Sequence, residues 1–152
     1  MCWNAFHWLL VATKFKFDPY EVVQDFEKAM TNAAKDQFTE AEQDGCEFHS
    51  KQVWQKKMKK LSVPKEQIRN AMSNNCLGIL TATPPHEARS KGMPCAKAAI
   101  ESMKPSSKDM MKWEKFWIYF EKRWLSSEEF MKMWNHHGVA DDEDVSNNGL
   151  ER

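Results

Sequence analysis

Residues 20–38 read YEVVQDFEKAMTNAAKDQF, and this stretch decides the expected fold because its hydrophobic period changes partway along it. Residues 20–24 combine β-branched and aromatic side chains, which is typical of a short strand. From Phe26 to Phe38 the apolar side chains recur at helical spacing, which predicts an amphipathic helix. Asp25 lies where strand passes into helix, a position at which side chains of open α/β sheets commonly meet ligands.

A second strand and a long helical region are expected after this unit. Asp44-Gly45 indicates a turn, residues 46–49 are predicted to form a brief strand, and a helix follows to about Leu61. From residue 63 to residue 139 the apolar repeats are helical, with interruptions at prolines and glycines. We therefore expect an α/β fold that is mostly α by residue count, in which a small sheet carries a large all-helical insertion.

The strongest helix signal is an aromatic stripe at i, i+4, i+7 and i+11, formed by Trp113, Trp117, Phe120 and Trp124. With lysines on the other faces, this stripe predicts a packed core face rather than a platform for stacking bases. Ser126-x-x-Glu129 predicts a capping box that opens a further helix. Gly138 predicts the end of that helix, with His136 and His137 in its last turn.

The composition is that of one domain with a real core. The chain has 152 residues, with 22 lysines and arginines against 22 aspartates and glutamates. This balance provides no global positive field and argues against a free-standing DNA-binding module, although it leaves room for a local basic face. Seven tryptophans and nine phenylalanines argue against disorder before Asp141.

Cysteine usage and hydropathy indicate an intracellular protein with no membrane partner. The four cysteines are widely spaced and form no Cys-x-x-Cys pair, so we expect free thiols in a reducing setting. The apolar stretch 6–12 is too short to span a bilayer and lacks the preceding basic residue of a signal peptide.

Three positions are candidates for chemistry, and each has a structural alternative. Asp25 suits a divalent cation, which prefers carboxylate ligands, but aspartate is also among the best helix caps, and taken alone this position favours the cap. Cys46 and His49 could be half of a zinc site, or a buried cysteine beside a hydrogen-bonded histidine. Glu151, taken alone, is a solvated surface residue.

The order and wording of these motifs resemble the transposase domain of Mutator-like elements (MULE). The resemblance runs from about Phe17 to Arg152. It rests on VVQDFEKAM, GCEFHSKQVWQKK, YFEKRWL, MWN and SNNGLER. It implies an RNase H-like fold with a DDE metal site, in which Asp25 matches the second catalytic aspartate and Glu151 the terminal glutamate. Cys46 and His49 match the family's C-x-x-H signature, which supports the site.

The resemblance also implies cofactor, partners and location. In the intact family, Asp25 and Glu151 would hold Mg²⁺ or Mn²⁺ that activates water or a 3′-hydroxyl against DNA, in a nuclear protein that can self-associate. It divides the chain into a stump (1–19), a partial RNase H-like core (20–62), a helical insertion (63–139), and an acidic loop with the glutamate motif (140–152).

Departures from the family pattern lead us to expect a fragment without strand transfer or nuclease activity. The family's first catalytic aspartate belongs on an earlier strand, and Asp18, in a turn before proline, does not replace it. Val145-Ser146 stands where the family has a basic residue and threonine. Two alternatives stay open: a non-enzymatic helical domain that binds another protein through its aromatic helix, and a small zinc-stabilised domain that uses Cys46 and His49.

Overall fold

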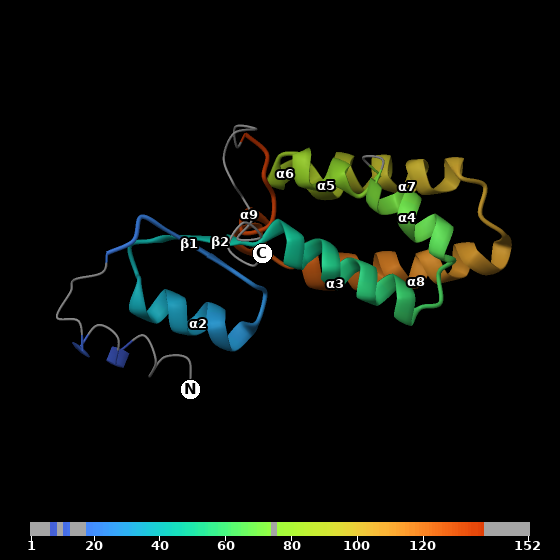
Figure 1. The fold of residues 1–152 in the computed structure, drawn as a ribbon. Coiled ribbons are helices and arrows are strands. Elements are labelled where there is room, and N and C mark those ends of the chain that lie inside the picture. The colour runs from blue at the N-terminus through green and yellow to red at the C-terminus, as the bar shows by residue number, and fades with distance from the viewer. Residues whose placement is uncertain (1–6, 9–10, 13–17, 74–75, 139–152) are drawn as a thin grey trace. The chain divides into compact units, whose positions relative to one another are not determined.

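The computed structural model describes residues 7–8, 11–12, 18–73 and 76–138. The described chain is mostly helical and contains one small parallel sheet of two strands (Figure 1). This confirms the expected predominance of helix. The described residues up to Ser50 belong to one compact unit, and those from Lys51 onward belong to a second. The expected loop 140–152 lies outside the described residues, as does most of the stump 1–19.

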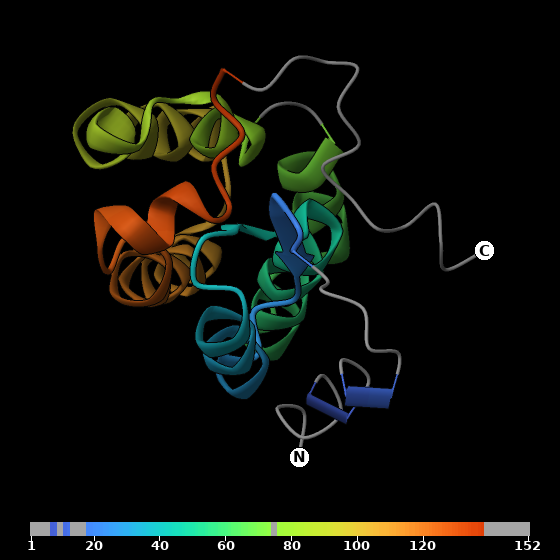
Figure 2. The same ribbon diagram turned by 90° about the vertical axis from the view of Figure 1, so that its left-hand side faces the viewer.

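The first unit is a β–α–β arrangement. Strand β1 (Glu21–Gln24) is followed by helix α2 (Lys28–Gln37) and strand β2 (Glu42–Gly45). The two strands are parallel, so the chain must cross back between them, and α2 makes this crossover (Figure 2). Ala33 and Ala34 are the buried side chains of α2. The predicted strand over 20–24 and the predicted helix over 26–38 are thereby confirmed.

The second strand lies earlier than the sequence indicates. Asp44-Gly45, predicted as a turn, belongs to β2, and the predicted strand over residues 46–49 is wrong because residues 47–49 form the start of helix α3 (Glu47–Lys60). The sequence EQDG has low β-propensity, so only its pairing with β1 makes it a strand. Hydrogen bonds flank the pairing: Glu42 donates its N–H to the carbonyl of Tyr20 over 2.9 Å, and Cys46 to that of Gln24 over 2.8 Å.

The regular elements of the second unit are all helical among its described residues. The helical region expected from residue 63 starts with two separate helices, α4 and α5, and further along a π-helical turn, η1, leads directly into α7. The elements that follow α3 are α4 (Lys65–Ser73), α5 (Gly78–Ala82), α6 (Pro85–Glu87), η1 (Ala88–Gly92), α7 (Met93–Ser102), α8 (Ser107–Trp124) and α9 (Glu128–Lys132).

Aromatic side chains form the core of this unit. The aromatic stripe of α8 is buried, which confirms that it is a core face. The indole of Trp54, from α3, meets it edge to face, with ring centroids 5.3 Å from Phe120 and 5.4 Å from Trp124. Trp134 closes the cluster at 5.8 Å from Trp54. Such aromatic pairs add to the stabilisation that burial alone provides.

Helix α9 starts and ends differently from the prediction. Its N-cap is Ser127, whose hydroxyl accepts the N–H of Phe130 over 3.2 Å, so the capping box predicted at Ser126 is wrong by one residue. The helix ends at Lys132 rather than near Gly138. The chain then leaves helical geometry because its polar groups bond to the end of α5, where the N–H of His136 donates to the carbonyl of Thr81 over 3.0 Å. The two histidines therefore do not lie in a helical last turn.

Candidate functional site at the carboxyl edge of the sheet

The parallel pairing brings two of the candidate residues to one edge of the sheet. Gln24, the last residue of β1, lies opposite Gly45, the last residue of β2. Asp25 and Cys46 are the next residues in each strand, so both leave the sheet at its carboxyl edge. Ligands of open parallel sheets bind outside this edge. The structure thus gives Asp25 and the Cys46-x-x-His49 motif a common location that their separation in sequence did not reveal.

Asp25 is held at the turn between β1 and α2. Its side chain is half-buried, and Oδ1 accepts the N–H of Glu27 over 3.0 Å. The N-cap of α2 is Glu27, which makes no side-chain capping bond. An aspartate before a helix is expected to be its N-cap. Asp25 is not the N-cap of α2, and its hydrogen bond instead closes the turn that precedes the helix. This hydrogen bond fixes the carboxylate and uses one of its two oxygens.

Cys46 directly precedes helix α3, and His49 lies in the first turn of that helix. Cys46 is fully buried, and its carbonyl accepts the N–H of Ser50 over 3.1 Å. The ring of His49 packs edge to face against Phe48, with centroids 5.6 Å apart. The Nδ1 atom of His49 is buried and makes no hydrogen bond to any described residue. Burying a ring nitrogen without a hydrogen-bond partner lowers the stability of the fold. The Nδ1 atom is therefore suited to accept a hydrogen bond or to ligate a metal.

The described residues do not complete a metal centre by themselves. Among them, no group of three or more His, Cys, Asp or Glu side chains converges on a common point. Asp25, Cys46 and His49 therefore do not form a common ligand set among the described residues. Glu151, the ligand predicted from sequence, lies outside the described residues.

The sheet also carries an acidic cluster that the sequence analysis missed. Glu21 pairs with Glu42 in the register, and Asp44 follows two residues along the same face. Burial raises the pKa of Asp44 to about 6, helped by the charge of Glu21, a hydrogen bond with Glu21 and the charge of Glu42. The acidic cluster arises from the parallel register, which places like charges from separate segments side by side. Sequence periodicity does not predict that register, so the cluster could not be found from sequence.

Comparison of the chain with protein-family models, curated proteins and solved structures found no match. Within the described part of the chain, no helix combines the length and the apolar character that crossing a bilayer requires.

Proposed function

We propose that this chain is a portion of a DDE transposase domain of the Mutator-like class, derived from an enzyme that cleaves DNA and transfers strands. In this proposal Asp25 and Glu151 are the two carboxylates of the metal site that the chain contributes. The alternative kept beside it is a helical domain that binds another protein.

The topology of the first unit is the observation that carries the proposal. Asp25 follows a strand that pairs in parallel with the next one through a helical crossover, and a helical block begins after β2. An RNase H-like core, as implied by the motif resemblance, has a catalytic aspartate at such a strand end. The half-buried and oriented carboxylate of Asp25 fits the oxygen donor that Mg²⁺ or Mn²⁺ prefers.

Each residue of the motif has a distinct role in the proposal. Asp25 and Glu151 would hold the cation, and the turn bond to Glu27 orients Asp25 before the cation binds. When bound, the divalent cation would activate water or a 3′-hydroxyl for attack on a DNA phosphodiester. Cys46 is buried directly after the strand end, and the buried Nδ1 atom of His49 would serve as a hydrogen-bond acceptor near the motif.

A Mn²⁺ titration followed by electron paramagnetic resonance tests the proposal without relying on activity. The intact chain is expected to bind Mn²⁺ at one site, and both Asp25→Asn and Glu151→Gln are expected to weaken that binding. Asp36→Asn removes an exposed carboxylate from α2 and is the matched control, expected to leave binding unchanged. Equal affinity in all four proteins would reject a shared site.

One observation favours the helical interaction domain. The aromatic face of α8 is buried inside the second unit, but Met111 and Ile118, one heptad apart on that helix, are 61% and 66% exposed. A partner of α8 would therefore contact these two aliphatic side chains rather than the aromatic stripe. Sedimentation at increasing concentration tests this surface: self-association that Met111→Ser and Ile118→Ser abolish would show that the exposed side of α8 forms a protein contact, which both the interaction domain and a self-associating transposase allow.

A further inference from the structure

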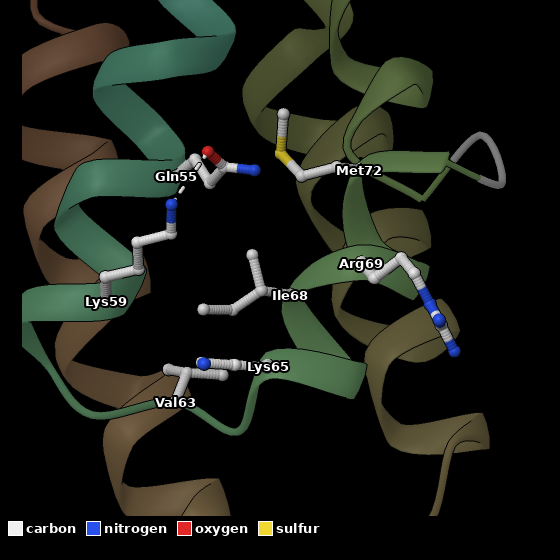
Figure 3. Close-up of a pocket in the computed structure, with 7 residues that line it drawn as sticks. All are labelled: Gln55, Lys59, Val63, Lys65, Ile68, Arg69 and Met72. Carbon is white, nitrogen blue, oxygen red and sulfur yellow. Dashed lines mark hydrogen bonds between the residues drawn. The ribbon is translucent and has the colours of Figure 1, made fainter.

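A groove with a cavity volume of about 630 Å³ lies between α3 and α4. Figure 3 shows Gln55 and Lys59 on the α3 side and Ile68 and Met72 on the α4 side. Val63, in the connection between the two helices, lies at one end of the groove. The volume falls within the range of about 300–1,000 Å³ that small-molecule sites occupy. All of these residues belong to the second unit.

The floor of the groove is apolar. Val63 is 5% exposed and Ile68 3% exposed, and the half-buried Met72 extends the same surface. A methionine side chain is flexible and adapts to ligands of different shape. An apolar chain or ring placed on this floor would be removed from water, which favours binding.

Two lysines supply charge at the groove. Lys59 donates from Nζ to Oε1 of Gln55 over 3.1 Å, and Lys65 is exposed at the start of α4. Within the described residues, neither ammonium forms an ion pair with a carboxylate. Arg69 also borders the groove, but Figure 3 shows its guanidinium directed away from Ile68, and its Nη2 lies 4.0 Å from Oε1 of Glu66. Positive charge without a counterion therefore lies beside an apolar floor.

We propose that this groove binds a small amphipathic carboxylate. The apolar part would lie on Val63, Ile68 and Met72, and the carboxylate would accept hydrogen bonds from Lys59 and Lys65. Neutral apolar compounds would leave the two ammonium groups without an anionic partner. Phosphate of nucleic acid would gain nothing from the floor. A carboxylate with an apolar chain is complementary to both features, and charge-assisted hydrogen bonds favour it further.

Decanoate is a suitable probe, with decylammonium as its counterpart of opposite charge and the same chain. Isothermal titration of the full chain is expected to show saturable binding of one decanoate and none of decylammonium. The methyl signals of Ile68 and Met72 should shift during the decanoate titration. The double variant Lys59→Gln, Lys65→Gln should bind decanoate about a hundredfold more weakly, the effect of two lost charge-assisted contacts at about tenfold, or about 1.4 kcal/mol, each. Lys108→Gln, an exposed lysine of α8 that does not line the groove, is expected to bind like the unmodified chain.

Three results would overturn the proposal: no saturable binding of decanoate, equal binding of decylammonium, or unchanged affinity in the double variant. Binding of an acidic helical peptide without binding of decanoate would also reject the small-molecule occupant. The methyl shifts locate the ligand independently of the variants, because a ligand bound elsewhere would leave Ile68 and Met72 unshifted.

Discussion

The backbone N–H of Cys46 donates to the carbonyl oxygen of Gln24 over 2.8 Å, immediately after the two parallel strands end. This bond fastens the start of α3 to the end of β1. The residue that follows Gln24 is Asp25, so the bond sets the candidate carboxylate beside the Cys46-x-x-His49 motif at one edge of the sheet. The proposed metal site and the stability of the first unit both depend on this short parallel pairing.

The first prediction concerns pH and Asp44. Its pKa is raised from 3.8 to about 6 in the folded chain, mainly by burial and then by Glu21 and Glu42. Between about pH 4 and 6 the folded state therefore binds more protons than the unfolded state, and stability falls as pH rises through this interval. Asp44→Asn should remove that pH dependence and stabilise the first unit at pH 7 by about 1 kcal/mol, allowing for solvent screening of a half-exposed group.

Hydrogen exchange of the amides in β1 and β2 measures this effect locally. Protection in the unmodified chain should decrease from pH 4 to pH 6 after correction for the intrinsic exchange rate. In the Asp44→Asn variant it should stay constant. Protection that rises with pH in the unmodified chain would show that the carboxyl of Asp44 is stabilised in its charged form, contrary to the prediction.

The second prediction concerns the aromatic core. Trp124 is fully buried and meets Trp54 edge to face, so Trp124→Ala should lower the free energy of unfolding by about 3–5 kcal/mol through lost burial and the cavity left behind. Urea unfolding followed by circular dichroism measures the loss. Ile118→Ala, on the exposed side of the same helix, should change stability by no more than about 0.5 kcal/mol. Similar losses in both variants would contradict the assignment of the core face.

The third prediction concerns Asn135, which joins two separate segments. Its Nδ2 donates to the carbonyl of Leu80 over 3.0 Å and to that of Thr83 over 2.6 Å, and its Oδ1 accepts the N–H of His137 over 3.0 Å. Asn135→Asp keeps the shape but replaces the donor by an acceptor that faces two carbonyls. We expect a loss of about 2 kcal/mol or more in urea unfolding.

Asn32→Asp, the same exchange at an exposed position of α2, provides the control and should be nearly neutral. If Asn135→Asp proves as mild as this control, the amide is not holding the end of α5.

The fourth prediction concerns thiol reactivity. Cys95 is exposed, whereas Cys76 is buried and its burial raises its pKa to about 11. Alkylation needs the thiolate, so iodoacetamide at pH 8 should modify Cys95 rapidly and Cys76 only after unfolding. Peptide mapping by mass spectrometry at successive times distinguishes the two sites. In denaturant both should react at similar rates, and rapid native-state labelling of Cys76 would refute its burial.

The sequence predicted those elements that are determined by the pattern of their own side chains. Strand β1, helix α2 and the aromatic face of α8 follow from the spacing of their own apolar side chains. Strand β2 did not follow, because EQDG becomes a strand only through hydrogen bonds to β1. The N-cap of α9 was predicted at Ser126 and lies at Ser127. Adjacent serines have the same capping hydroxyl, so the sequence alone does not distinguish them.

Only the local part of the candidate site could be predicted from sequence. Asp25 could be placed at a strand–helix junction from its neighbours in sequence. Its common edge with Cys46 requires the parallel register, and the groove between α3 and α4 requires the packing of two helices. In the sequence, Lys59 and Lys65 cannot be distinguished from ordinary solvated lysines. The structure shows that they line the same groove as the apolar side chains of Val63 and Ile68.

The most direct test of the central claim is paramagnetic broadening by Mn²⁺ in amide NMR spectra of the full chain. If Asp25 and Glu151 share a cation, substoichiometric Mn²⁺ should broaden the signals of both residues together, and Asp25→Asn should restore the signal of Glu151. Broadening at Asp25 that leaves Glu151 sharp, or broadening at Glu151 that persists in Asp25→Asn, would contradict a shared site and the proposed transposase ancestry.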